Sequence, residues 1–295
     1  MALWEEARLL IDGELVEATG RGRFENLNPA TEEVIGEVPD ASTEDVERAI
    51  SAARRCFDES DWSRDHAFRS HCLRQLRDGL QSRLETLRTL TVAEVGCPIS
   101  MTYGPGLDDP VRWLGSYADF LDGYEWRTDA GVAEVMGGRH QRWVEREPMG
   151  VVGAITPWNV PHDINLKKMG WAVAAGCTVV LKAAPTTSWC ANFLGEVIAE
   201  QTDIPAGAVN ILTASSNEIG ECITRDPRVD LVGFTGSTAT GKRILEVCAP
   251  QIKPAQLELG GKSAALLLPG TPGLPAVAAA LGAVVCFHAG QGCAI

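Results

Sequence analysis

The order of apolar and polar positions predicts strands that alternate with helices in the second half of the chain. Helical stretches there separate five short apolar runs: Val151–Ile155, Thr178–Lys182, Val209–Leu212, Leu231–Phe234 and Gln256–Leu259. Strands that alternate with helices form a parallel sheet with right-handed crossovers, so we predict an α/β fold with a doubly wound parallel sheet. Ligands of such sheets bind beyond the carboxyl ends of the strands, and we therefore look for a site there.

The first half of the chain predicts helices and hairpins that cover this sheet. Ser42 and Asp45 have the spacing of a capping box, and an amphipathic helix is expected behind them. Turn residues and helical periodicity predict the other elements: a hairpin over 9–16 with its turn at Asp12-Gly13, a turn at Asn28–Thr31 before a second strand pair, two amphipathic helices, the second ended by Gly96 and Pro98, and a helix over Leu107–Leu121.

Residues 122–147 break the helical period. Val132–Val135 and Gln141–Glu147 are typical of two strands, and Gly137-Gly138 between them favours a turn. We therefore predict a hairpin that projects from the body of the protein.

Composition and charge limit the class of partner. The 295 residues carry a net charge of −13, which argues against a nucleic-acid or anionic-membrane surface. The run Ala276–Phe287 is too short to span a bilayer, and its small residues are typical of a buried helix. Met1–Arg8 lacks the basic and apolar regions of a signal peptide. Nine scattered cysteines without a Cys-x-x-Cys pair argue against a zinc site or a disulfide framework, and predict a metal-free protein of the reducing cytoplasm.

A glycine-rich turn, Thr235–Lys242, follows the fourth strand of the series and precedes a helix. Such turns let the backbone approach a phosphate, which the free N–H groups of the helix start can bind. Gly236, Gly241 and Lys242 bring the turn close to a P-loop, but Arg243 stands where a magnesium-binding Ser or Thr is required. A P-loop ATPase is therefore disfavoured. Phosphate binding and a plain helix cap by Ser237 remain equally good interpretations at this point.

Polar residues also follow the first two strands of the series. Asn159 comes after Thr156-Pro157-Trp158, where its amide could stabilise an oxyanion, although an Asn that only closes a turn is locally favoured. Lys182 could bind ribose hydroxyls, although a strand-terminal lysine is more often a solvated end.

A carboxylate and a thiol complete the candidate chemistry. Glu258 lies between Leu257 and Leu259, so we expect it to be poorly hydrated and suited to general-base work. Cys293 follows a glycine-rich turn, which favours a reactive position. We expect the other cysteines to be buried core residues: Cys56, Cys72, Cys97, Cys177, Cys190, Cys222, Cys248 and Cys286.

Together these motifs resemble those of the aldehyde dehydrogenase superfamily, in the same order and at similar spacing. The resemblance covers essentially all 295 residues. It rests on Pro157–Asn159, Val180–Lys182, Phe234–Ser237 with Gly241, Glu258–Lys262 and Gly290–Cys293, with an opening, Ile11–Val16 through Asn28–Thr31, that is also similar.

The resemblance implies a mechanism. Cys293 is expected to attack an aldehyde carbonyl, and the Asn159 amide with the Cys293 backbone N–H to stabilise the oxyanion. Hydride transfer to NAD, with NADP as the alternative, would leave a thioester, and Glu258 would activate the water that hydrolyses it. Relatives that pass the acyl group to coenzyme A tend to lack this base, so we expect a carboxylic acid product. The implied cofactor-binding residues include Gly236 and Ser237 for the pyrophosphate, Lys182 for the adenosine ribose and Trp158 for the wall of the cleft; the full set is Ile155, Thr156, Pro157, Trp158, Lys182, Gly236, Ser237, Gly241, Leu259 and Gly260.

The resemblance also implies a division of the chain. Residues 1–121 and 148–257 would form a Rossmann-like NAD(P)-binding domain, 122–147 an oligomerisation hairpin, and 258–295 the start of a catalytic domain. One residue departs from the family pattern. Pro185 stands where many relatives carry a Glu suited to bonding ribose hydroxyls, so the choice between NAD and NADP stays open.

Family members continue well beyond the cysteine, so we expect this chain to be the N-terminal part of such a protein, a homo-oligomer at full length that acts on a small aldehyde. Two hypotheses remain: an active dehydrogenase, and a truncated, inactive nucleotide-binding remnant or interaction module of the same family. A Cys–His hydrolase is disfavoured because His288 and His162 come without an orienting partner, so both are expected to be structural.

Overall fold

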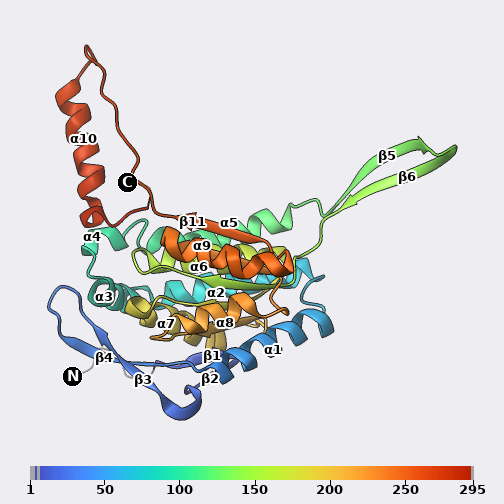
Figure 1. Ribbon diagram of the computed structural model, residues 1–295, viewed down its shortest axis with the longest axis horizontal. Helices are drawn as coiled ribbons and strands as arrows, with labels where there is room; N and C mark the ends of the chain where they lie inside the picture. The colour runs from blue at the N-terminus through green and yellow to red at the C-terminus, as the bar shows by residue number, and fades with distance from the viewer. Residues whose placement is uncertain (1–3, 5–6, 294–295) are drawn as a thin grey trace.

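A seven-stranded sheet forms the centre of the computed structural model, which describes Trp4 and residues 7–293 (Figure 1). Five neighbouring strands run parallel, and the two at the N-terminus extend the sheet in antiparallel orientation. In spatial order the strands are β11 (Ala255–Leu259), β10 (Leu231–Gly236), β7 (Val151–Ile155), β8 (Thr178–Lys182), β9 (Val209–Leu212), β1 (Leu9–Ile11) and β2 (Glu14–Val16).

Helices cover both faces of this sheet and enclose two separate apolar cores. The first face carries α6 (Pro161–Ala175) and α7 (Ser188–Gln201), which are covered in turn by α2 (His66–Ser82), α3 (Leu84–Val95) and α5 (Asp108–Asp122). The second face carries α1 (Thr43–Glu59), α8 (Glu218–Arg225) and α9 (Thr238–Cys248). The predicted doubly wound α/β fold is confirmed.

The parallel strands end together at one edge of the sheet. Ile155 pairs with Lys182 on one side and with Phe234 on the other, so the residues that follow these strands lie side by side. The apolar runs of β7 and β8 are buried on both faces, which explains why they do not alternate with polar residues.

The helix ends follow their predicted signals. Ser42 and Asp45 form the capping box of α1, with the Ser42 backbone N–H donating to the Asp45 carboxylate at 2.9 Å. Gly96 ends α3 in the left-handed conformation, with φ +67°, and a Cβ there would lie 2.6 Å from the Pro29 ring.

The Asn28–Thr31 turn was predicted to precede a strand pair, and that placement is wrong. The turn instead joins β3 (Arg23–Leu27) to β4 (Val34–Pro39), two antiparallel strands that form a small sheet of their own. The error arose because β3 carries charged residues and has almost no apolar alternation to reveal it.

The predicted projecting hairpin is present and longer than expected. It consists of β5 (Arg127–Val135) and β6 (Gly138–Glu145), which pair antiparallel and extend away from the body of the protein (Figure 1). Its turn is Met136-Gly137, one residue earlier than the predicted Gly137-Gly138. Both strands are almost entirely exposed in the chain by itself.

The predicted burial of the 276–287 helix is wrong. The helix forms as α10 (Leu274–Cys286), but none of its residues is buried, and Figure 1 shows it standing away from the body. Cys286 is accordingly exposed, contrary to its predicted core position, and Cys222 is half-buried. An apolar helix is buried only where a second surface packs on it, and the described residues supply none for α10.

The remaining elements are short. They are α4 (Ile99–Thr102) and four 3₁₀ turns: η1 (Thr19–Arg21), η2 (Pro185–Thr187), η3 (Ala249–Gln251) and η4 (Phe287–Gly290). Within residues 4 and 7–293, no helix combines the length and apolarity needed to cross a membrane. The prediction about Met1–Arg8 falls largely outside the described residues.

Candidate functional site

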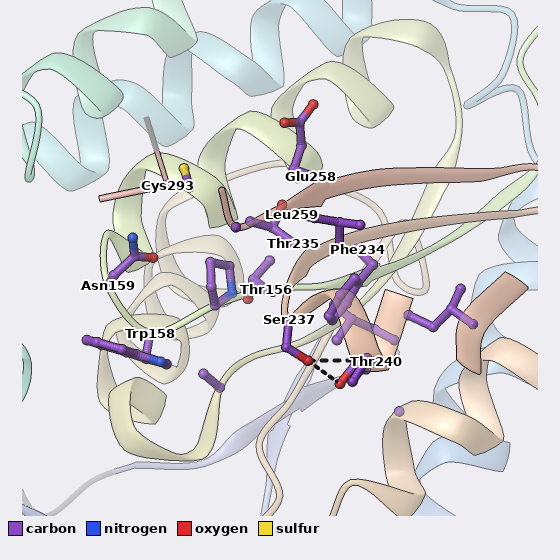
Figure 2. Close-up of a pocket in the computed structure, with 18 of the residues that line it drawn as sticks. Thr156, Trp158, Asn159, Phe234, Thr235, Ser237, Thr240, Glu258, Leu259 and Cys293 are labelled. Carbon is purple, nitrogen blue, oxygen red and sulfur yellow. Dashed lines mark hydrogen bonds between the residues drawn. The ribbon is translucent and has the colours of Figure 1, made fainter. Parts of the chain in front are cut away.

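A cleft of about 710 Å³ lies where β7, β8, β10 and β11 end. Figure 2 shows its polar side chains arranged around the open space, with Cys293, Asn159 and Glu258 in one part and Ser237 and Thr240 in another. The cleft brings together all of the predicted site residues except Gly241: Ile155, Thr156, Pro157, Trp158, Asn159, Lys182, Gly236, Ser237, Glu258, Leu259, Gly260 and Cys293.

Two hydrogen bonds connect the turn before Cys293 to the Asn159 turn. The Asn159 side-chain amide donates to the Gln291 carbonyl at 2.7 Å, and His288 Nε2 lies 2.7 Å from the Asn159 carbonyl oxygen. Because a carbonyl only accepts, Nε2 of His288 carries the proton. The buried His288 therefore has the structural role expected for it, and among the described residues the second amide N–H of Asn159 has no partner, which suits it to bind a ligand.

Cys293 is exposed and lies in the same cleft as Asn159. The short η4 turn and the glycines around it bring the thiol to the cleft surface, whereas Cys56, Cys72, Cys97, Cys177, Cys190 and Cys248 are buried as predicted. The arrangement places an exposed thiol and a side-chain amide donor on the same cleft.

The predicted poor hydration of Glu258 is wrong. Glu258 pairs with Thr235 in the ladder, but it lies on the edge strand β11, and its side chain is exposed. Apolar neighbours along a strand point to the opposite face, so they do not dehydrate the residue between them. Glu258 still lines the cleft, where it is open to solvent.

A lysine that the sequence analysis missed lies close to Glu258. Burial lowers the pKa of Lys168 on α6, and the nearby Glu258 carboxylate partly opposes this shift. Gly233 on β10 lies beside the lysine, since a Cβ at that position would be in ordinary contact with the Lys168 ammonium nitrogen, at 3.6 Å. The sequence carries no local signal for this lysine, because its neighbours lie on β10 and β11, which only the fold brings near α6.

The glycine-rich turn is both a helix cap and a cleft wall. Ser237 caps α9 by accepting a hydrogen bond from the Thr240 backbone N–H at 3.1 Å (Figure 2). The first turn of α9 still offers free N–H groups beside the cleft, which suits an anion. Gly236 tolerates no side chain, because its Cβ would lie 2.4 Å from the Phe234 ring.

Gly241 does not line the cleft. A Cβ on Gly241 would lie 2.8 Å from the Leu259 side chain, so the glycine allows α9 to pack closely on β11. Its contribution to the site is therefore through packing.

Lys182 is not the solvated end that was locally favoured. Its side chain is only 4 % exposed at the cleft floor, and burial lowers its pKa to about 8, with Asp40 partly offsetting the effect. Pro185 lines the same cleft and brings no carboxylate to it. This part of the cleft therefore has a buried cation facing a ligand space.

Two hydroxyl groups at the cleft floor have no protein partner. Thr156 directly follows β7, and Thr235 lies near the end of the neighbouring strand β10. In the described part of the chain, the buried Oγ1 atom of each is without a hydrogen-bond partner. Buried polar groups are normally satisfied, so these two fit a site that a polar ligand completes.

The sequence analysis missed a second residue besides Lys168: the buried Glu94, which holds in place the start of α7 next to the cleft. Glu94 in the last turn of α3 accepts hydrogen bonds from the backbone N–H groups of Trp189 (2.7 Å) and Cys190 (2.9 Å), and from the Asn26 amide (2.7 Å). It thereby caps α7, whose preceding turn carries Pro185. A lone glutamate in an amphipathic helix gives no sign of this role.

His162 is likewise part of the support. It is buried on α6 with Nε2 2.7 Å from the Thr91 hydroxyl, and burial lowers its pKa to about 3, which keeps it neutral. Residues 4 and 7–293 contain no group of three or more His, Cys, Asp or Glu that could hold a metal ion.

Comparison with known proteins agrees with this geometry. Residues 15–295 match the family model described as "Aldehyde dehydrogenase family". Among curated relatives, the chain is 38 % identical over 264 residues to aminoacetaldehyde dehydrogenase of Pseudomonas aeruginosa, which covers 88 % of this chain and 52 % of the relative. It is 38 % identical over 259 residues to betaine aldehyde dehydrogenase 1 of Oryza sativa subsp. japonica, covering 86 % and 51 %.

Solved structures show the same similarity. The NAD+ complex of aldehyde dehydrogenase from Bacillus cereus superimposes with a TM-score of 0.89 at 34 % identity, covering 98 % of this chain and 57 % of that one. The chain thus spans about half the length of the curated relatives it matches.

Proposed function

The chain belongs to the aldehyde dehydrogenase family, and on that premise we propose that it carries the coenzyme cleft and catalytic thiol of an enzyme that oxidises an aldehyde to a carboxylic acid with NAD(P)+. One observation carries the proposal. A single cleft holds Cys293, Asn159 and Glu258 in one part, and Lys182 with the Gly236-Ser237 turn in another.

The cleft residues fit a dinucleotide. Gly236 leaves the backbone free to approach a pyrophosphate, and the start of α9 supplies N–H donors for it. Lys182 suits a ribose hydroxyl, and the unpartnered hydroxyls of Thr156 and Thr235 offer further polar contacts. We assign Ile155, Pro157, Trp158, Leu259 and Gly260 to the walls of this coenzyme site.

Cys293 begins the reaction. Its thiolate attacks the carbonyl carbon, forming a C–S bond, and the carbonyl electron pair moves to oxygen. The free amide N–H of Asn159 and the backbone N–H of Cys293 donate to that oxyanion, and in enzymes each such donor stabilises the transition state by about 3 kcal/mol. The nicotinamide, when bound, accepts the hydride that leaves this carbon.

Glu258 completes the reaction. A thioester then joins the acyl group to Cys293, and Glu258 removes a proton from the water that attacks it. The C–S bond breaks, the carboxylic acid leaves, and the thiolate is restored. The exposed position of Glu258 gives it direct access to that water.

NAD is the coenzyme we propose, and the NAD+ complex of the Bacillus cereus relative supports it. NADP is the alternative that Pro185 leaves open. A glutamate at this position would repel a 2′-phosphate, and the proline carries no charge that would do so.

For the whole protein we propose a homo-oligomer joined through the exposed hairpin of residues 122–147, with 1–121 and 148–257 as the coenzyme domain and 258–295 as the start of the catalytic domain. A cytoplasmic location is supported by the nine free cysteines, because a reducing compartment keeps thiols unpaired.

A second candidate function is an inactive nucleotide-binding module that acts through contacts with another polypeptide. The observation that favours it is the exposure of α10, because exposed apolar surface of this kind marks an interaction site.

The test combines binding and turnover. Purified protein is titrated with NAD by calorimetry and then given NAD and propanal, and the absorbance of reduced nicotinamide is followed. Turnover that is abolished in the Cys293→Ala variant supports the dehydrogenase. NAD binding without turnover favours the second candidate, and a protein that binds neither NAD nor NADP contradicts both.

A further inference from the structure

An ion pair lines the part of the cleft that lies between α8 and α9. Glu221 on α8 and Arg243 on α9 both line the cleft, and they meet through two hydrogen bonds. Arg243 Nε donates to one Glu221 carboxylate oxygen at 3.2 Å, and Nη2 donates to the other at 2.6 Å. The guanidinium and the carboxylate therefore meet edge to edge through two hydrogen bonds, and we call this bidentate Arg243–Glu221 pair the fork.

The fork determines what Arg243 can offer to a ligand. Nη1 donates to Glu246 at 3.4 Å, so each nitrogen of the guanidinium already has a carboxylate acceptor. In the described part of the chain no aromatic ring stacks on the flat faces of the group, and the side chain is 52 % exposed, so the faces are open to a ligand. A guanidinium held in one plane stacks well on a flat aromatic ring.

Charge also favours a ring over a phosphate at this position. Glu221 and Glu246 both pair with Arg243, and Glu221 pairs with Arg225 as well, so the cluster has two cations and two anions. A phosphate would have to displace a carboxylate, whereas a neutral base would not. The pair holds the pKa of Glu221 below its usual range, so this carboxylate stays charged.

The position of the pair identifies the ring. In the proposed function the nicotinamide must lie against Cys293, so the other half of the dinucleotide extends toward Ser237 and the slot between α8 and α9. We propose that Arg243, held in place by Glu221, stacks on the adenine base and sets the orientation of the coenzyme. This inference rests on the proposed function. It assigns a role to Arg243, whose presence argued against a P-loop in the sequence.

The experiment compares ligands with and without a base. The whole chain is titrated with ADP and with ribose 5-phosphate by NMR chemical-shift perturbation, which also measures weak affinity. The first variant is Arg243→Lys, which keeps the positive charge but lacks the planar guanidinium. The second is Glu221→Gln, which removes the negative charge that holds the guanidinium in the fork. The matched control is Arg225→Lys, because Arg225 also pairs with Glu221 but does not line the cleft.

Stacking of this kind at an exposed site predicts that Arg243→Lys weakens ADP binding by about threefold to fivefold. Ribose 5-phosphate affinity and the control variant should stay at the wild-type value, and Glu221→Gln should weaken ADP binding by a smaller factor. Equal loss for ADP and ribose 5-phosphate would instead make Arg243 a phosphate ligand, and no loss, or tighter ADP binding, would also overturn the proposal.

The two proposals fail in different ways. If the wild type binds NAD and Arg243→Lys behaves like Arg225→Lys, only the stacking role falls. If the wild type binds neither NAD nor ADP, the proposed function falls and the stacking role falls with it.

Discussion

Glu94 makes the stability of this fold depend on pH in an unusual direction. Its side chain is only 1 % exposed, and burial raises its pKa to about 7 from an ordinary value of 4.5, although the three hydrogen bonds to its carboxylate act in the opposite sense. The unfolded chain therefore releases this proton near pH 4.5, whereas the folded protein keeps it until about pH 7.

The sign follows from that difference. Below pH 4.5 both states are protonated, and the contribution to folding is fully present. As the pH rises toward 7, only the unfolded state gains from ionisation, so stability is lost over this window. The difference between a pKa of 4.5 in the unfolded chain and about 7 in the folded protein corresponds to about 3 kcal/mol of unfolding free energy.

Glu94→Gln is the perturbation that isolates this effect. The amide has nearly the same size and still offers an oxygen to the start of α7, but it does not titrate. We expect the unfolding free energy of the wild type, measured in urea, to fall relative to that of the variant by about 2.5 kcal/mol between about pH 5 and about pH 8. A difference between the two proteins that stays constant over this range would refute the reasoning.

Three further perturbations test the cleft and the fold. Lys182→Met should weaken ADP binding. Because burial lowers the lysine pKa to about 8, the ADP affinity of the wild type should decline above that pH while that of the variant does not; calorimetric affinities of the two proteins that change with pH in parallel would contradict this. Pro185→Glu should weaken binding of 2′,5′-ADP by about tenfold relative to ADP through like-charge repulsion, and an unchanged ratio would exclude a 2′-phosphate near this position. Gly96→Ala should lower the unfolding free energy by about 1–2 kcal/mol, because φ is +67° and Pro29 occupies the space for Cβ; an unchanged Tm would contradict that account.

The sequence was most informative where local signals and burial agree. The strands β7, β8 and β10 are apolar runs bounded by turn residues, and they are buried on both faces, so their pattern depends little on more distant contacts. The residues at their ends could be located for the same reason, because parallel strands deliver their carboxyl ends to one edge.

The errors concern properties that depend on a partner surface. The composition of α10 favours burial, but burial requires another element to pack on it. Glu258 has apolar neighbours in sequence, yet its hydration is set by its place on the edge strand. Glu94 and Lys168 gave no local signal, because their partners lie on other elements that only the fold brings near.

The position of β1 in the sheet has a consequence for how the protein is made. Leu10 pairs with Ile211 on β9, so β1 finds this second neighbour only after some 200 further residues have been added. At the usual speeds of translation, that delay is roughly 10–40 s. Leu9–Ile11 can pair with Glu14–Val16 at once, but its other edge stays unpaired for this period, and this side of the sheet closes only after β9 has been made.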